Sequence, residues 1–333
     1  MADETGGLLF LAEADTERIL NWPDVIACLA AAYGTRVQAD AAPPRVVARM
    51  GPAWLRVLAA MSHTGRNMGV KIIGRARTPL SSYLIPLWNQ ETAELVCLLD
   101  GKHVTAMRTA GTSVMAADRL LSKRDIRLAV LGAGQEATAH ASAIATLRRI
   151  VSLAVYSPTP ASREGFARRF SAELQIEARA VDSAAAAVAG ADLIIAAARS
   201  RDETPILRGE WLQPGTMLIS VGSTLQEQRE VDPATMEKAD VIVADVPEEV
   251  IHETGDMLAA REAGVRFADK IVALADLVQG RCAVRQESNN IIVYKSVGSA
   301  IQDIAVAEMC FEKARQFGKG TRLPVGLAVK GKK

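Results

Sequence analysis

The sequence predicts an α/β protein in which a doubly wound parallel sheet is inserted into an α+β domain. From residue 126 onward, short apolar runs alternate with helical or turn-rich segments, as in parallel strands joined by helices. The first 120 residues differ, because a helix precedes several β-rich segments there. A long amphipathic segment near the carboxyl end is placed to return to that first part. We therefore expect one domain from residues 1–120 plus 300–333 and a second from residues 121–299.

The composition indicates a globular protein that acts on a small molecule. The chain has 333 residues, which favours two domains of about 150 residues each, and 49% of them are hydrophobic. Its 39 basic and 38 acidic residues leave a formal charge of +1. Since no single-sign field attracts nucleic acid or an anionic membrane, we expect neither as a partner.

The cysteines and histidines show no metal-binding or redox spacing. The four cysteines include no CxxC pair, and the four histidines do not form HExxH. We expect no catalytic metal and a reducing compartment. The first residues are acidic where a signal peptide is basic, and Asp192 interrupts the most apolar stretch, so the chain is expected to be cytoplasmic.

In the second domain, the expected elements follow one another as strand, helix and strand. An apolar run at residues 126–131 ends in glycines and precedes an alanine-rich helix at 135–150. A second strand at 151–156 leads into a helix at 162–174. Further strands are expected at 193–197, 217–221, 241–244 and 291–294.

The first domain is expected to begin with a helix near Pro23. Strands follow around Val46 and at residues 70–73, 83–88 and 95–99, and a long helix covers residues 299–316. We expect the segments at 54–67 and 249–256 to be loops.

The turn after the first strand of the second domain carries the GxGxxA pattern. It consists of Gly132, Gly134, Gln135, Glu136 and Ala137, with Ala133 between the glycines. At the junction of a buried strand and a helix, such glycines let the backbone approach a pyrophosphate at the helix amino terminus. We therefore predict a Rossmann dinucleotide site, although an ordinary strand-to-helix turn has the same spacing.

The end of the second strand indicates which nucleotide binds. An NAD site usually has Asp or Glu there, whereas this chain has Ser157 and Thr159, followed by Arg163. These side chains can donate hydrogen bonds to a 2′-phosphate, so NADP(H) is favoured. NAD(H) stays possible if Ser157 and Thr159 cap the next helix and Arg163 lies on a solvated face.

Several further segments, together spanning nearly the whole chain, resemble the ornithine cyclodeaminase/mu-crystallin family. The stretch Thr105-Ala106-Met107-Arg108-Thr109-Ala110-Gly111-Thr112-Ser113 is the most specific. The others, in family order, are Pro43-Pro44-Arg45, Gly69-Val70-Lys71-Ile72-Ile73, Leu98-Leu99-Asp100-Gly101, Val221-Gly222-Ser223 with Arg229-Glu230-Val231-Asp232, Glu253-Thr254-Gly255-Asp256, and Lys295-Ser296-Val297-Gly298-Ser299-Ala300-Ile301-Gln302-Asp303.

The resemblance implies a homodimer and names the substrate-binding residues. In that family the first domain, completed by the terminal helix, forms the dimer interface and much of the substrate pocket, and the Rossmann domain faces it across a cleft. Arg45, Lys71 and Arg108 match positions around the substrate carboxylate and reacting carbon, with Lys71 and Arg108 catalytic. A guanidinium suits a carboxylate, and a lysine beside an arginine loses its proton more readily. The alternative is that all three are surface residues paired with carboxylates.

The same resemblance adds cofactor-binding residues outside the glycine turn: Thr109, Val221, Gly222, Ser223, Ser296 and Gly298. Thr109 contacts cofactor phosphate or substrate, or else caps the helix that follows it. Ser296 and Gly298 resemble the segment beside the nicotinamide, and the glycine also suits a strand-to-helix turn for backbone reasons alone.

The expected activity depends on one departure from the family pattern. Its lyase members carry an aspartate where this chain has Thr224, and a hydroxyl cannot act as a carboxylate base. We expect an NAD(P)H-dependent reductase of imino acids, either cyclic ketimines or imines of small 2-oxo acids, or the reverse amino-acid dehydrogenase. The alternatives are an ornithine cyclodeaminase-type lyase, with Glu227 replacing the aspartate, and an NADPH-dependent small-ligand-binding protein of mu-crystallin type.

Overall fold

The computed structural model describes residues 7–36, 38–78, 80–284 and 287–330. The chain forms two compact units, Met1–Thr109 with Ser299–Lys333, and Ala110–Gly298. Helix α3 (Gly101–Leu120) belongs to both, so the division falls inside this helix rather than at residue 120. The second half of α3 is bonded within the second unit, since Ser113 Oγ lies 3.0 Å from His140 Nε2.

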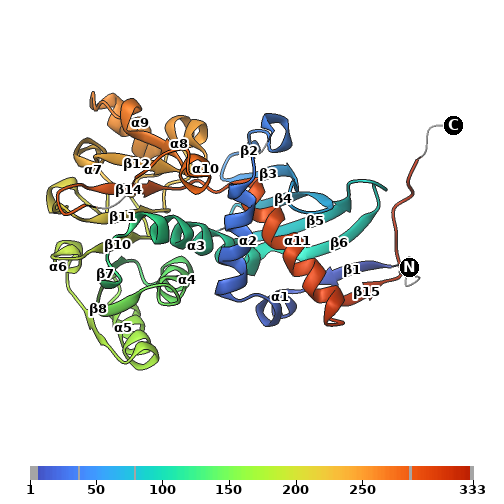
Figure 1. The fold of residues 1–333 in the computed structure, drawn as a ribbon, viewed down its shortest axis with the longest axis horizontal. Coiled ribbons are helices and arrows are strands. Elements are labelled where there is room, and N and C mark those ends of the chain that lie inside the picture. The colour runs from blue at the N-terminus through green and yellow to red at the C-terminus, as the bar shows by residue number, and fades with distance from the viewer. Residues whose placement is uncertain (1–6, 37, 79, 285–286, 331–333) are drawn as a thin grey trace. The chain divides into compact units, whose positions relative to one another are not determined.

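The first unit contains a seven-stranded sheet in the order β15-β1-β6-β5-β4-β3-β2. Its strands are β1 (Leu8–Leu11), β2 (Val46–Met50), β3 (Ala53–Met61), β4 (Asn67–Arg75), β5 (Ser81–Asn89), β6 (Leu95–Asp100) and β15 (Thr321–Leu323). The helices, besides the start of α3, are α1 (Glu13–Ile19), α2 (Trp22–Gly34), the 3-10 turn η1 (Ala39–Ala41) and α11 (Ala300–Gln316). Helix α11 packs on β3, β4 and β5 and lies beside α2 (Figure 1).

The prediction of a loop at residues 54–67 is wrong, because strand β3 occupies most of this segment. Leu58 and Ala60 face the buried side of this strand, while Leu55, Val57 and Ala59 face the opposite side. Apolar residues on both faces remove the polar alternation that marks a half-buried strand.

The second unit contains an eight-stranded parallel sheet in the order β13-β12-β14-β11-β10-β7-β8-β9. Its strands are β7 (Asp125–Leu131), β8 (Arg149–Tyr156), β9 (Glu177–Ala180), β10 (Leu193–Ala196), β11 (Met217–Ser220), β12 (Val241–Ala244), β13 (Ile271–Ala273) and β14 (Ile292–Lys295). The chain builds outward from β7 on one side to β9, then restarts beside β7 with β10. This confirms the doubly wound sheet and places its switch point between β7 and β10.

Helices connect these strands, and three of them correct the sequence prediction. They are α4 (Gln135–Ile144), α5 (Pro160–Leu174), α6 (Ala184–Val188), η2 (Gly209–Trp211), α7 (Pro233–Lys238), α8 (Pro247–Glu253), α9 (Gly255–Glu262), η3 (Ala268–Lys270) and α10 (Leu274–Val278). Helix α4 ends at Ile144 rather than 150, because a tight turn closed by the Arg148 N–H on the Ile144 carbonyl leads directly into β8. Helices α8 and α9 occupy the expected loop at 249–256.

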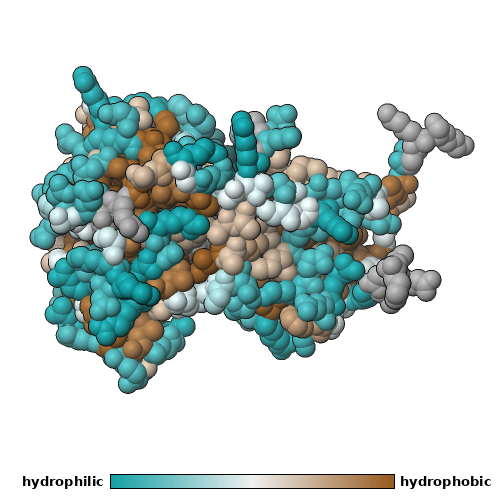
Figure 2. Space-filling model, viewed as in Figure 1, coloured by the Kyte–Doolittle hydropathy of each residue, from teal (hydrophilic) through white to brown (hydrophobic). Residues whose placement is uncertain are grey.

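The core of the second unit lies on the parallel sheet, whose strands β10 and β11 are buried at every residue. Hydrophilic residues cover much of the face shown in Figure 2, with smaller hydrophobic patches between them. No helix among the described residues is both long and apolar enough to span a membrane.

Candidate functional site

Strand β4 places Lys71 on the buried face of the first sheet. Alternation along the strand points Asn67, Gly69, Lys71 and Ile73 to the same side, where α11 packs. Only 1% of Lys71 is exposed, and its Nζ donates to Asp303 Oδ1 of α11 at 2.7 Å. A lysine in an apolar strand is therefore held by a buried carboxylate.

Gly69 allows this close approach between strand and helix. A Cβ at this position would lie 2.8 Å from the Ile304 side chain and 2.8 Å from the Pro86 carbonyl oxygen. Since real Cβ atoms do not approach so closely, any side chain here would displace α11 or β5. The glycine two residues before Lys71 thus brings Asp303 within reach of the ammonium group.

Arg108 on α3 completes the cluster. Its Nε lies 2.8 Å from the same Asp303 Oδ1, and its Nη1 donates to Gln302 Oε1 at 2.7 Å. The Gln302 amide in turn donates to the Tyr33 hydroxyl on α2 at 2.8 Å. All of these side chains are buried, so the guanidinium has a defined orientation.

Burial and the neighbouring charges bring the pKa of Lys71 close to neutral pH, so that its side chain can donate and regain a proton. Burial lowers the pKa of Lys71 to about 7; the charges of Arg108 and Arg45 act in the same direction, and Asp303 opposes them. Asp303 Oδ2 is buried without a hydrogen-bond partner in the part of the chain that the structure describes. This oxygen can therefore still accept a hydrogen bond from an N–H group of a ligand.

Two further arginines lie on the same side of the sheet. Arg45, directly before β2, is 9% exposed, and its charge reaches Lys71. Arg56 on β3 is 6% exposed and stacks over the Trp54 ring at 5.0 Å. The sequence prediction named Arg45 but missed Arg56.

Sequence reasoning also assigned no role to Asp303 or Gln302. Both lie in α11, a helix whose residues are mostly buried, and each is itself 0% exposed. A charged residue within a buried apolar segment is the same signal that drew attention to Lys71, and it applies equally to Asp303.

The predicted glycine turn joins β7 to α4 in the second unit. Gly132 has φ of +116°, a conformation that favours glycine, and Gly134 occupies the N-cap position of α4 with open space where a Cβ would lie. Ala137 is fully buried and lets α4 pack closely on the sheet. The open cradle at the helix amino terminus fits a pyrophosphate.

A cavity of about 290 Å³ adjoins this turn. It is lined by Glu136, residues 197–200, Val221 and Gly222, which follow the carboxyl ends of β10 and β11. Ser223 is buried and donates to the Gln228 carbonyl instead. Gln135 begins α4 at the exposed end of the helix.

At the end of β8, Arg163 is folded against the strand terminus. Its Nη1 donates to the Ser157 carbonyl at 3.0 Å and its Nη2 to Asp182, and only 14% of the side chain is exposed. Thr159 occupies the N-cap position of α5, but its hydroxyl does not cap the helix. The Thr159 hydroxyl therefore does not cap α5, and Arg163 does not lie on a solvated face.

Three other predicted residues have defined partners. Thr109 lies within α3, where its hydroxyl donates to the Thr105 carbonyl, so it does not cap a following helix. The Ser296 hydroxyl donates to Asp245 Oδ2 at 2.6 Å, and the Gly298 N–H donates to the same oxygen at 2.8 Å. Asp245 thus holds the turn after β14, where Gly298 has φ of +77°.

Thr224 lies in a loop of the second unit that a glutamine organises. Its backbone N–H donates to Gln228 Oε1 at 2.8 Å, and its hydroxyl lies 3.3 Å from the same atom. The hydroxyl therefore has a partner within its own loop.

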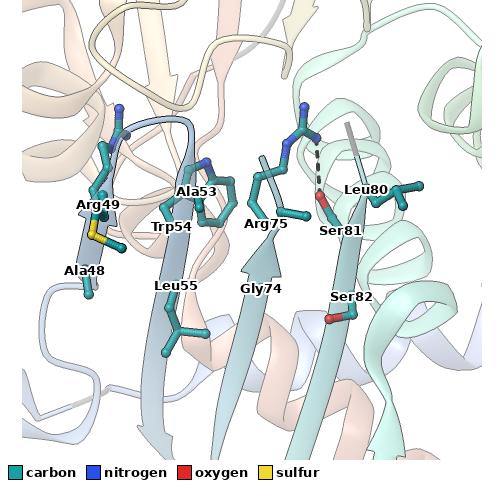
Figure 3. Close-up of a pocket in the computed structure, with 12 residues that line it drawn as sticks. Ala48, Arg49, Ala53, Trp54, Leu55, Gly74, Arg75, Leu80, Ser81 and Ser82 are labelled. Carbon is teal, nitrogen blue, oxygen red and sulfur yellow. Dashed lines mark hydrogen bonds between the residues drawn. The ribbon is translucent and has the colours of Figure 1, made fainter. Parts of the chain in front are cut away.

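The face of the first sheet opposite α11 is also apolar. Its side chains, all wholly or partly exposed, are Val46, Ala48, Met50, Leu55, Val57, Ala59, Met61, Met68, Val70, Ile72 and Leu84. A hollow of about 590 Å³ opens there at the ends of β2 to β5 (Figure 3). Arg75 donates to the Ser81 hydroxyl at its rim. We call this the outer sheet face.

These features define an NAD(P)-dependent oxidoreductase. A nucleotide-binding α/β unit is inserted into another domain, and that domain contains a buried lysine, aspartate and arginine. The chain belongs to the ornithine cyclodeaminase/mu-crystallin family, whose model matches residues 10–318. This confirms the resemblance seen in the sequence.

Individual relatives agree with this assignment. The chain is 30% identical over 241 residues to a Δ1-pyrroline-2-carboxylate reductase of Bacillus cereus, which covers 72% of this chain and 73% of that protein. It is 29% identical over 265 residues to the ketimine reductase mu-crystallin of Mus musculus, covering 78% and 80% respectively. The structure of Thermococcus litoralis Δ1-pyrroline-2-carboxylate reductase with NADH and L-proline superposes with a TM-score of 0.87 at 28% identity, covering 95% of this chain and 100% of that one.

Proposed function

We propose that the protein is an NAD(P)H-dependent reductase that converts imino acids to α-amino acids, or catalyses the reverse dehydrogenation. The observation that carries this proposal is the contact of Lys71 and Arg108 with a single buried oxygen of Asp303. Such a cluster binds an anionic substrate and exchanges a proton with it. Relatives of the chain carry names of imine reductases, which supports the same chemistry.

The substrate carboxylate binds to the guanidinium groups of Arg45 and Arg108, whose paired N–H donors match its two oxygens. Lys71, in its ammonium form, donates a hydrogen bond and then a proton to the imine nitrogen. NAD(P)H, when bound, supplies the hydride that adds to the imine carbon. Asp303 Oδ2 accepts the N–H of the resulting amine, and Asp303 Oδ1 keeps Lys71 in position. One proton and one hydride thus convert C=N to CH–NH.

The lyase alternative lacks its base at the matching position. Thr224 stands there, and its hydroxyl is directed to Gln228. Near neutral pH a threonine hydroxyl does not accept a proton from an ammonium group, so ring closure with loss of ammonia is disfavoured.

The nucleotide is proposed to be NADP(H). Arg163 lies beside Ser157, at the strand end where the ribose is bound in this fold, and no carboxylate follows β8 directly. A guanidinium held there offers charged hydrogen bonds to a 2′-phosphate.

We also propose that the protein is a homodimer joined through the outer sheet face. Met50 is 72% exposed and Leu55 is 46% exposed, although both belong to a continuous apolar surface of β2 and β3. Such a surface is stabilised by burial against a second copy of itself. A cytoplasmic location is proposed as well, supported by the four cysteines, which are all free thiols.

The decisive experiment follows the absorbance of NADPH and NADH with purified protein and a panel of substrates. The panel contains Δ1-pyrroline-2-carboxylate, Δ1-piperideine-2-carboxylate and small 2-oxo acids with ammonia or methylamine. Oxidation of the nucleotide, with formation of the amino acid, is the expected result. No oxidation across the panel, together with ammonia released from ornithine, would overturn the proposal in favour of the lyase.

A further inference from the structure

A second buried charged network lies in the second unit, directly behind the cavity beside the glycine turn. Glu230, Asp256 and Lys295 form it, each with an exposed fraction of 1% or less. Lys295 Nζ lies 2.8 Å from Asp256 Oδ2, and Asp256 Oδ1 accepts the backbone N–H of Glu230 at 2.7 Å. Burying three ionisable side chains is costly unless each is fixed by hydrogen bonds.

The Glu230 carboxylate joins the two backbone segments that line the cavity. Its Oε1 accepts the N–H of Ala198, which follows β10, at 3.2 Å. Its Oε2 accepts the N–H of Gly222, which follows β11, at 2.9 Å, and the Ser220 hydroxyl at 2.6 Å. Both Ala198 and Gly222 line the cavity. One side chain therefore sets the separation of the two segments.

The fit around this carboxylate is tight. A Cβ at Gly222 would lie 2.2 Å from Glu230 Oε1 and 3.0 Å from the Ala198 carbonyl oxygen. Gly222 therefore gives the carboxylate the room to reach both backbone amides. Lys295 reaches the same group through Ser220 Oγ, to which it donates at 3.0 Å.

The cavity lies on the side of the switch point that takes the nicotinamide half of a dinucleotide. Strands β10 and β11 lie on one side of β7, whereas β8, which ends beside the predicted ribose-phosphate residues, lies on the other. We propose that Glu230 is a positioning residue for the nicotinamide half, because it holds the backbone of Ala198 and Gly222 in the conformation that binds it. This inference rests on nucleotide binding, which is one part of the proposed function.

The protonation state of Glu230 gives the proposal a measurable signature. Burial, helped by the neighbouring Asp256, raises the pKa of Glu230 to about 7, although Lys295 and the Ser220 hydroxyl oppose the rise. As pH falls through about 7, Glu230 gains a proton, and the protonated oxygen becomes a weaker acceptor for a backbone N–H. The affinity for the reduced nucleotide should therefore decrease as the pH is lowered from 8 to 6.

The test measures the Kd of NADPH and NADH by fluorescence between pH 6 and 8.5, with no imine substrate present. In Glu230→Gln the amide presents a donor to one of the two N–H groups, so we expect the Kd to rise by about 10-fold or more at pH 8. The Kd of adenosine 2′,5′-bisphosphate and ADP, which lack the nicotinamide, should stay unchanged. In Glu230→Gln, whose amide does not titrate, the Kd of NADPH and NADH should no longer depend on pH.

Asp232→Asn is the matched control. Asp232 lies two residues away and caps α7 through the Thr235 N–H and hydroxyl. We therefore expect its replacement to lower the melting temperature and to leave the Kd unchanged. A folded Glu230→Gln variant with wild-type Kd across the pH range would overturn the proposal. So would equal losses for NADPH and the adenosine fragments, which would mean general damage.

Should Glu230→Gln fail to fold, Ser220→Ala provides the test. Loss of the hydroxyl removes a hydrogen bond that lowers the Glu230 pKa, so the midpoint of the Kd against pH curve should move to higher pH. An unmoved midpoint contradicts the proposal. Because these measurements need only nucleotide binding, they stay informative even if imine reduction is not observed.

Discussion

Lys71 on β4 and Asp303 on α11, which are 232 positions apart in the sequence, meet at 2.7 Å in the interior of the first unit. The same oxygen, Asp303 Oδ1, also contacts Arg108 Nε, so two cationic side chains bind one carboxylate. This arrangement keeps Lys71 near the midpoint of its titration at neutral pH. A group so poised can give a proton and regain it.

Replacement of Lys71 should abolish turnover while leaving nucleotide binding intact. In Lys71→Met the proton donor is lost, and kcat for imine reduction is expected to fall by about 10²-fold to 10⁴-fold. Steady-state kinetics and the Kd of NADPH together check this. The control is Lys102→Met, because Lys102 is half-exposed and paired with Glu13 on the surface. A kcat within twofold of wild type for Lys71→Met would remove this residue from the mechanism.

The pH profile should identify Asp303 as the group that tunes Lys71. In the wild-type protein, kcat/KM for reduction should decline as pH rises through about 7, because Lys71 loses its proton. Asp303 raises the Lys71 pKa, so in Asp303→Asn the decline should begin at lower pH. Asp24→Asn, which removes a surface carboxylate bonded to Lys313, should leave the profile in place. A decline that moves to higher pH in Asp303→Asn contradicts the assignment.

Arg163 should distinguish the two nucleotides. Arg163→Ala is expected to weaken NADPH binding by about 10-fold to 100-fold, since charged hydrogen bonds to a phosphate are lost, and to leave NADH binding nearly unchanged. Fluorescence titration with each nucleotide measures the ratio. Arg168→Ala serves as the control, because Arg168 is on the same helix and pairs with Glu164 on its exposed side. Equal losses for NADPH and NADH would mean that Arg163 does not contact a 2′-phosphate.

The close contact at Gly69 should be measurable as stability. Gly69→Ala places a Cβ 2.8 Å from the Pro86 carbonyl oxygen, and the free energy of unfolding is expected to fall by about 1–3 kcal/mol. Urea denaturation of the wild type and the variant gives this difference. At Gly74, on the same strand, a Cβ would meet Ser82 Oγ at 3.4 Å, an ordinary contact. Gly74→Ala should therefore be much milder, and equal effects at both positions would argue against a tight helix-strand contact.

A charge on the outer sheet face should dissociate the proposed dimer. Leu55→Asp buries a carboxylate in an apolar interface, so sedimentation velocity should report a monomer where the wild type is a dimer. Val151→Asp introduces the same charge at an exposed apolar residue of β8 and should leave the dimer intact. A Leu55→Asp variant that stays dimeric would place the interface elsewhere.

The sequence predicts the features that depend on neighbouring residues, and it does not predict those that depend on residues far apart in the chain. The glycine turn and the parallel strands follow from local patterns, and Lys71 stands out because its neighbours are apolar. Strand β3 was missed because both of its faces are apolar, which no local alternation reveals. Asp303 was not assigned a role because its partner is 232 positions away, and pattern alone cannot pair residues at that distance.

The inserted position of the second unit has a consequence for the order in which the protein matures. The ribosome completes residues 110–298 as one uninterrupted stretch, whereas the first unit lacks α11 until the chain reaches residue 316. The nucleotide-binding unit can therefore fold during synthesis, while the carboxylate that Lys71 and Arg108 require arrives only after it. Until then the two cations on the emerging sheet and helix have no Asp303, so the catalytic cluster is among the last parts of the protein to form.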